Sequence, residues 1–224
     1  MNSVIVSSLF FLSLFSGGAC YPSDLPHRTL VGVTVVDTPI VRDAISYAQG
    51  YEDNSVFNHS MRSWLFGSII VTKTPAYTNV IDKEVHALGT ILHDIGFDPK
   101  VKHDQNIDPL HPVAGGNAVR KFLANHTEGK LWNESRVQLL VDAVTLHLED
   151  SDSTKAIEIR AVRDGQQIDL LGPSGLVTTA EFNSIVAAYP LGDMKAHMAQ
   201  DHMQPKNPSH QMMLPNSKEH GHTL

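Results

Sequence analysis

The stretch Leu92-His93-Asp94-Ile95-Gly96 closes an apolar run and places a histidine directly before an aspartate. Neither side chain packs well among apolar groups, because a buried imidazole or carboxylate needs hydrogen bonds or a compensating charge. A divalent cation supplies that compensation, and imidazole with carboxylate suits zinc, iron or manganese. Two adjacent ligands cannot hold an ion alone, so we expect further ligands elsewhere in the chain.

Other parts of the chain supply candidates for these ligands. The predicted metal ligands are His59, His93, Asp94 and Asp169, with His111 and His147 as optional additions. Four ligands of this kind hold one divalent ion and leave a position open for water, whose pKa the ion lowers towards neutrality. The structural alternative is a buried network of hydrogen bonds at the end of a helix.

Three side chains are predicted to take part in catalysis: Asp94, Arg62 and His147. Asp94 or, as an alternative, Asp169 is a candidate to accept a proton from the activated water. Arg62 lies one helical turn after His59, where it either orients a substrate group or forms a salt bridge with an acidic neighbour. His147 is either a hydrogen-bond donor behind the ligands, a ligand of a second ion, or a capped core histidine.

Apolar residues recur at helical spacing along most of the chain, and polar caps or prolines mark where helices begin. The predicted helices cover residues 39–50, 54–73, 82–94, 112–124, 134–148, 153–163, 178–188 and 192–200. Asp169 falls in a segment between two glycines, residues 165–172, which is left outside any predicted helix. There is no series of alternating strands, no glycine-rich phosphate loop and no internal repeat.

The predicted architecture is a single all-α domain over residues 37–204. Residues 21–36 contain proline and β-branched residues, which predicts an extended N-terminal arm or a short strand. Residues 205–224 are rich in Pro, Asn and His, and we expect a mobile C-terminal tail.

Composition limits the classes of partner. The chain has 224 residues, enough for one domain with a sizeable core, and a net charge of −7 with few basic runs. This argues against nucleic acid as the main partner, and leaves a small molecule as the expected one. The single cysteine has no partner for an intrachain disulfide.

The N-terminus predicts a signal peptide over residues 1–20. An apolar run from Val4 to Phe15 is followed by the small residues 16–19, and it is too short to be an integral membrane segment. We therefore expect a secreted protein or one of the secretory pathway. If the run is instead a buried N-terminal element, the protein is cytoplasmic. Three Asn-x-Ser/Thr triplets begin at Asn58, Asn125 and Asn133.

The order of the predicted ligands resembles that of the HD-domain superfamily of metal-dependent phosphohydrolases. In that all-α family an upstream His, a His-Asp doublet and a downstream Asp hold the ion. The surrounding motifs are similar to the cyanamide hydratase-type branch, common in fungi, and the resemblance covers about residues 37–208. The matching motifs are Asp37-Thr38-Pro39, Asn58-His59-Ser60-Met61-Arg62, Leu92-His93-Asp94-Ile95-Gly96, Gly115-Gly116-Asn117-Ala118-Val119-Arg120 and Ala187-Ala188-Tyr189-Pro190.

The resemblance implies an HD-domain helical bundle and an enzyme, a hydrolase or hydro-lyase that directs metal-activated water at a small molecule. The substrate is then nitrile- or cyanamide-like, or a phosphoester. The branch implies one ion, zinc before iron or manganese, whereas His111 and His147 resemble ligands of two-metal members. Two alternatives remain: a di-iron oxygenase on the same scaffold, and a non-catalytic HD protein that binds a metabolite.

Overall fold

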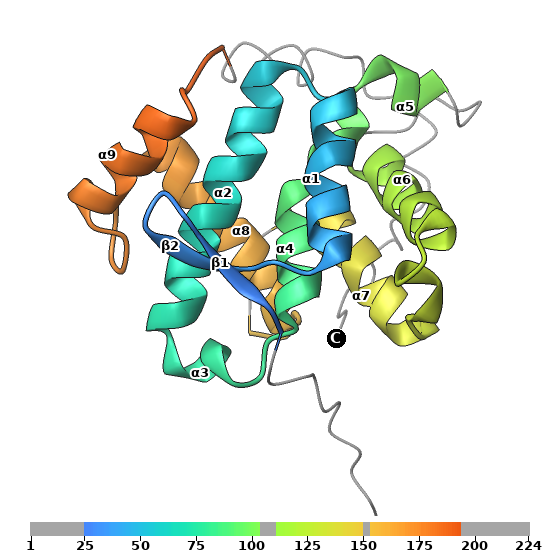
Figure 1. Cartoon of the computed structure of the whole chain (residues 1–224), viewed down its shortest axis with the longest axis horizontal. Helices are drawn as coiled ribbons and strands as arrows, with labels where there is room; N and C mark the ends of the chain where they lie inside the picture. Colours follow the sequence, from blue (N-terminus) through green and yellow to red (C-terminus); the bar gives the residue numbers. More distant parts are fainter. Residues whose placement is uncertain (1–24, 104–110, 150–152, 194–224) are drawn as a thin grey trace, which may run out of the picture.

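The computed structural model describes residues 25–103, 111–149 and 153–193. Within these ranges the chain is mostly helical, with one small two-stranded sheet at the side of the helices (Figure 1). The predicted helical class is thereby confirmed, whereas the HD-domain identity stays a prediction. The predicted signal peptide, the predicted tail and almost all of the helix expected at 192–200 lie outside the described residues.

The N-terminal arm is a hairpin. Strands β1 (His27–Leu30) and β2 (Val33–Val36) pair antiparallel, and Val31 and Gly32 form the turn with φ values of 50° and 80°. Positive φ at both turn residues matches the right-handed twist of paired strands. Strand β2 is mostly buried and lies against the helix α2. The expected short strand is therefore present, but its pairing was not predicted.

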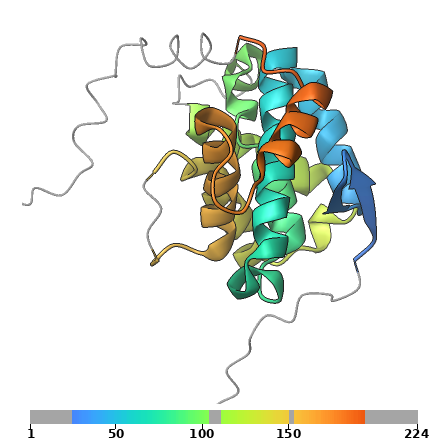
Figure 2. The same cartoon turned by 90° about the vertical axis from the view of Figure 1, so that its left-hand side faces the viewer.

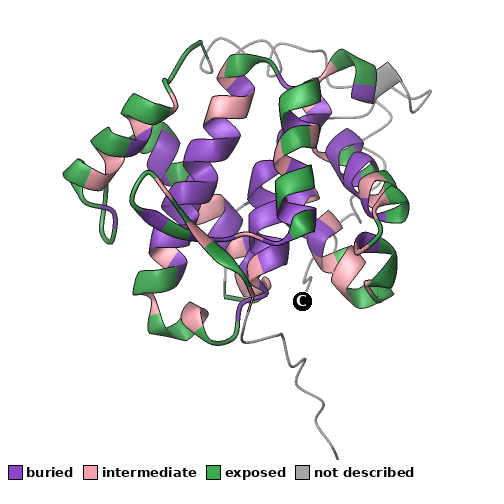
Figure 3. Ribbon diagram, viewed as in Figure 1, coloured by how far each residue is buried: buried purple, intermediate pink, exposed green. Residues whose placement is uncertain are grey.

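A long helix runs through the middle of the molecule. Helix α1 (Pro39–Tyr51) begins with proline in its first turn, and α2 (Asn54–Lys73) follows after two residues. The carboxylate of Asp53 caps α2 by accepting the N–H groups of Ser55 and Val56. Most of α2 is buried (Figure 3).

Helices α4 (Lys83–Ile91) and α8 (Ile157–Leu171) both pack against α2. On another side of α2 lies α9 (Thr179–Ala188) (Figure 2). Phe66 of α2 and Phe182 of α9 stack with ring centroids 5.1 Å apart. The remaining elements are α3 (Pro75–Thr78), η1 (Ile95–Phe97), α5 (Pro99–His103), α6 (His111–Asn125), η2 (Gly129–Leu131) and α7 (Glu134–Thr145). No helix among the described residues has both the length and the apolar character needed to cross a membrane.

Helix α8 differs most from its predicted extent. The prediction placed a helix at 153–163 and left residues 165–172 outside it, yet α8 continues to Leu171. A Cβ at Gly165 would overlap the carbonyl oxygen of Ser63 and crowd the backbone of Gly67. This glycine therefore permits the close approach of α2 and α8. Asp169 lies one turn further along the same face, towards α2.

Candidate metal centre

The His-Asp doublet lies just beyond the end of α4. The helix stops at Ile91, and Asp94 has φ −102° and ψ 6° at the start of η1. Adjacent side chains on a helix diverge by about 100°, whereas this turn brings Nε2 of His93 to 3.1 Å from Oδ2 of Asp94. Helix α4 therefore ends two residues before His93. The turn that follows directs the His93 imidazole and the Asp94 carboxylate to the same place.

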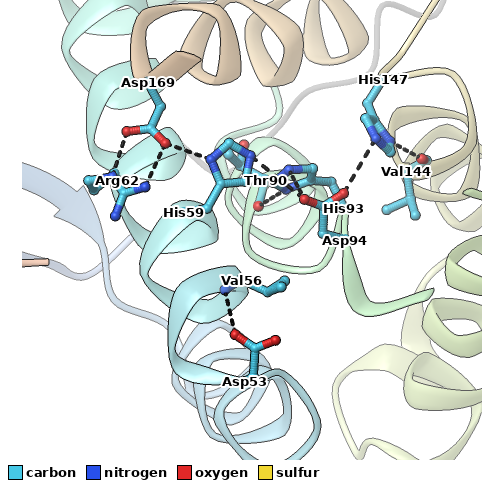
Figure 4. Close-up of polar contacts among 10 residues, drawn as sticks. All are labelled: Asp53, Val56, His59, Arg62, Thr90, His93, Asp94, Val144, His147 and Asp169. Atoms are coloured by element: carbon cyan, nitrogen blue, oxygen red, sulfur yellow. Dashed lines mark hydrogen bonds and ion pairs between the residues drawn. The ribbon is translucent and has the colours of Figure 1, made fainter. Parts of the chain in front are cut away.

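A third buried side chain reaches this point from α2. Nε2 of His59 is 3.7 Å from Oδ2 of Asp94, and the rings of His59 and His93 have centroids 5.0 Å apart. The three residues each offer a ligand atom, and these atoms lie within 4.8 Å of one another. Two ligands of a tetrahedral zinc ion lie about 3.3 Å apart, as bonds near 2 Å require. The cluster of His59, His93 and Asp94 could therefore hold a metal ion (Figure 4).

Hydrogen bonds fix which nitrogen of each imidazole faces Asp94. Nδ1 of His93 lies 2.7 Å from the carbonyl oxygen of Thr90, and Nδ1 of His147 lies 2.5 Å from that of Val144 (Figure 4). A carbonyl oxygen only accepts, so both Nδ1 atoms carry the proton. The lone pair of each neutral ring is then on Nε2, which faces Asp94. Metal-binding histidines are usually held in this way.

The electrostatics of the cluster favour a positive charge between its members. Burial opposes the charged form of His93, but Asp94, the Thr90 carbonyl and Asp169 outweigh it, so the pKa of His93 is raised. Burial likewise opposes the charged form of Asp94, and His93, His59 and His147 together outweigh it, so the pKa of Asp94 is lowered. A proton or a cation is therefore stabilised at the point where the predicted ligands meet.

Asp169 lies behind His59 rather than within the cluster. Its Oδ2 accepts the Nδ1–H of His59 at 2.6 Å, and its two oxygens also accept from Nε and Nη2 of Arg62 at 2.5 and 2.8 Å. The prediction made Asp169 a direct ligand; in the structure its carboxylate contacts His59 and Arg62, and it is not one of the three residues whose ligand atoms lie together. Burial tends to raise the pKa of Asp169, but the bonds from Arg62 and His59 outweigh it and lower the pKa.

Arg62 forms the salt bridge that was one of its two predicted alternatives. Besides Asp169, its Nη1 donates to the carbonyl oxygens of Tyr189 and Pro190 at 3.0 and 2.7 Å. The side chain is 1% exposed. Its expected catalytic role in orienting substrate does not fit this placement, because most of its N–H groups are already bound within the protein.

His147 approaches Asp94 from the opposite side. It follows α7, is buried, and places Nε2 3.6 Å from Oδ1 of Asp94, the oxygen that faces away from His59 and His93. This placement fits either a proton-transfer role or a ligand of a second ion. His111 is the first residue of α6, but its side chain lies outside the described residues, so its expected role stays a prediction.

Sequence reasoning missed two features of this region. The carbonyl groups of Thr90 and Val144 orient imidazoles, and a backbone group leaves no signature in the sequence. Glu52, at the junction of α1 and α2, is a buried acid; burial raises its pKa well above the usual value, and the charge of Asp94 raises it further. It belongs to no motif, and only the rarity of buried acids could have marked it once the burial was known.

Comparison with known proteins leaves the chain without an assigned family. No known protein family matches it, and no curated protein matches it in sequence. The fold and the centre thus define a mostly helical protein with a buried cluster of two histidines and one aspartate.

Proposed function

We propose that this protein is a metal-dependent hydrolase or hydratase that adds water to a small molecule at His59, His93 and Asp94. One observation carries the proposal. Three buried side chains from two distant parts of the chain place ligand atoms within 4.8 Å of one another. A packing role would not require this, because apolar side chains fill a core without the cost of taking imidazoles and a carboxylate out of water.

The donor set suits zinc first, with iron or manganese as alternatives. The bound ion supplies water of lowered pKa, which is the nucleophile. The protein contributes orientation: Asp169 fixes His59, and the Thr90 carbonyl fixes His93.

Asp94 and His147 are placed to move a proton. Oδ1 of Asp94 is turned away from the other two residues of the cluster and lies 3.6 Å from Nε2 of His147. A proton taken up at this oxygen can pass to the imidazole nitrogen, whose Nδ1 stays bound to the Val144 carbonyl.

The charges around the cluster favour a neutral substrate. Arg62 is bound to Asp169 and to two backbone carbonyls, so it has little capacity left for a phosphate. Asp94 adds a negative charge at the cluster, whereas the charge of Asp169 is balanced by Arg62. A nitrile- or cyanamide-like compound avoids the repulsion that a phosphoester would meet.

The test is a substrate panel with the zinc-, iron- and manganese-loaded protein. Cyanamide, small nitriles, p-nitrophenyl phosphate and nucleotides are supplied, and urea, amide or phosphate is measured. We expect hydration of a neutral compound, lost in Asp94→Asn and kept in Asp43→Asn, whose carboxylate is 64% exposed. Equal turnover by both variants would refute the proposed site, and phosphate release alone would refute the neutral substrate.

A di-iron oxygenase is the second candidate, and one observation favours it. Asp94 presents Oδ2 to His59 and His93, and Oδ1 to His147, as a carboxylate that bridges two ions would. This candidate requires two irons per chain and consumption of oxygen. A non-catalytic metabolite-binding protein would instead bind members of the panel without turnover.

A further inference from the structure

Three Asn-x-Ser/Thr triplets, the acceptor pattern for N-linked glycans, begin at Asn58, Asn125 and Asn133. A glycan is bulky and strongly hydrated, so a folded protein carries one only where the asparagine side chain faces solvent. The proposed function makes no use of Asn125 or Asn133. The local structure of each triplet decides which of the three is compatible with a glycan.

The triplet at Asn58 is largely buried. Nδ2 of Asn58, the atom to which a sugar would be attached, donates to the carbonyl oxygen of Pro190 at 3.1 Å. The next residue, His59, belongs to the buried cluster, and Ser60, which carries the hydroxyl of the triplet, is fully buried. A sugar on Nδ2 would have to fit between α2 and the segment after α9, beside a predicted metal ligand. We therefore expect no glycan at this position.

The triplet at Asn125 is open to solvent. Asn125 is the last residue of α6, and both it and Thr127 are exposed. Its Nδ2 donates to the carbonyl oxygen of Lys121 at 2.9 Å, within the last turn of the same helix. A glycosylated amide keeps one N–H, which can make the same bond. A sugar at this position would extend from the end of α6 into solvent.

The triplet at Asn133 is also open to solvent, since Asn133 and Ser135 are both exposed at the start of α7. The Asn133 side chain caps this helix, because its Oδ1 accepts the N–H of Arg136 at 2.9 Å. A glycan is attached through Nδ2, so the capping oxygen remains in place. The helix cap and a glycan are therefore compatible in one side chain.

Both exposed triplets lie in the connection from α6 to α7, at the lower right of Figure 1. This connection is remote from the metal cluster. A Cβ at Gly115 would lie 3.6 Å from the carbonyl oxygen of His93, and Asn125 follows about 15 Å further along the same helix. Helix α7 begins at this connection and ends before His147. Glycans here would leave the centre unobstructed.

We propose that the α6–α7 connection is N-glycosylated at Asn125 and Asn133, and that Asn58 stays unmodified. The inference goes beyond the proposed function and depends on the entry into the secretory pathway that the expected signal peptide implies. The donor is an oligosaccharide linked to a polyprenyl diphosphate. Nδ2 forms a bond to the anomeric carbon, the bond from that carbon to the diphosphate oxygen breaks, and the diphosphate leaves with the electron pair. The amide loses one proton.

The experiment expresses the full chain, including residues 1–20, in a eukaryotic cell line and recovers the protein from the medium. An amidase that removes N-linked glycans converts each modified asparagine to aspartate. When the reaction runs in heavy-oxygen water, peptide mass spectrometry identifies the converted positions. Gel mobility before and after the treatment reports the number of glycans on each chain.

The test variants are Thr127→Ala and Ser135→Ala, which remove only the hydroxyl of a triplet. Ser135→Ala keeps the Asn133 cap, so loss of a glycan is separated from loss of helix stability. The matched control is Asn58→Gln, which keeps an amide but removes the third triplet. If this control does not fold, the peptide map of the wild type gives the state of Asn58.

We expect heavy oxygen at positions 125 and 133 of the wild type and none at position 58. Thr127→Ala and Ser135→Ala should each migrate faster than the wild type by one glycan. The double variant should migrate with the deglycosylated wild type, and Asn58→Gln should migrate with the untreated wild type.

Several results would overturn the inference. A protein retained inside the cell without glycans refutes it, as does a secreted protein without heavy oxygen at both positions. Heavy oxygen at only one position refutes the assignment of the other. Heavy oxygen at position 58 of the folded, secreted protein refutes the exclusion of Asn58. All of these results come from mass and mobility, so they are independent of the proposed reaction.

Discussion

Asp169 holds His59 in place, with 2.6 Å between its Oδ2 and the Nδ1 of the imidazole. The same carboxylate is bound by Arg62 through two N–H groups. One acid therefore orients a predicted metal ligand and neutralises a buried cation. The two roles can be separated by experiment, because metal affinity reports the first and folding stability reports the second.

Asp169→Asn should weaken metal binding, because an amide is a poorer acceptor for the His59 N–H than a carboxylate. We expect the metal affinity to fall by about 10–100-fold, as for other groups that orient histidine ligands. A competition titration with a chelator measures it. Asp164→Asn, on the same helix, is the control, and equal affinities in both variants would show that Asp169 does not support the centre.

Removing either partner of the Arg62–Asp169 pair should destabilise the metal-free protein. Arg62→Leu and Asp169→Leu each leave an uncompensated buried charge, with a cost of about 3–5 kcal/mol in the free energy of unfolding. The double variant should lose less unfolding free energy than the two single variants together. Urea denaturation of the wild type and the three variants gives the coupling free energy between the two side chains. Strictly additive losses would argue against a direct interaction.

The contact between α2 and α8 should not tolerate a side chain at position 165. In Gly165→Ala the new methyl group meets the backbone of Ser63 and Gly67, neither of which can rotate away. We expect a loss of about 3 kcal/mol in unfolding free energy. Gly50→Ala is the control, because a Cβ there meets no described atom within 4 Å, and it should gain up to about 1 kcal/mol. A neutral Gly165→Ala would contradict the close helix contact.

His86 should make stability depend on pH. Burial lowers its pKa to about 4, and its Nε2 has no hydrogen bond to any described residue. Between pH 6.5 and 4 the unfolded chain binds a proton that the folded chain does not, so stability falls as the pH falls. The contribution is about 3 kcal/mol and is complete near pH 4.

Urea denaturation of the metal-free protein at pH 7 and pH 4 measures this contribution. His86→Leu should reduce the loss of stability between the two pH values by about that amount. The exposed His27→Leu should not change it. If the two leucine variants showed the same pH dependence, the buried imidazole would not be the cause.

The parts of the fold with strong local signals were predictable from sequence. The helices expected at 39–50, 54–73 and 178–188 correspond to α1, α2 and α9, since apolar spacing and polar caps both mark them. The hairpin was missed because Val31-Gly32 is not a usual turn pair. The predicted helix at 153–163 was shorter than α8. In the sequence, a glycine such as Gly165 looks the same whether it ends a helix or allows two helices to pack closely.

The sequence predicted which residues form the buried cluster, but not how the side chains around it are arranged. His59, His93 and Asp94 form the buried cluster, as the ligand pattern anticipated. Asp169 was expected to be a ligand; in the structure its carboxylate pairs with Arg62 and accepts the N–H of His59. Such roles depend on which helices pack together, and spacing along the chain does not encode this.

Metal content of the purified protein, measured by mass spectrometry after dialysis against a metal buffer, tests the central claim most directly. We expect one zinc, iron or manganese ion per chain in the wild type and in the control His27→Ala, and a nearly complete loss in His93→Ala. A wild type without bound metal would contradict the account, as would a His93→Ala protein that retains the full amount.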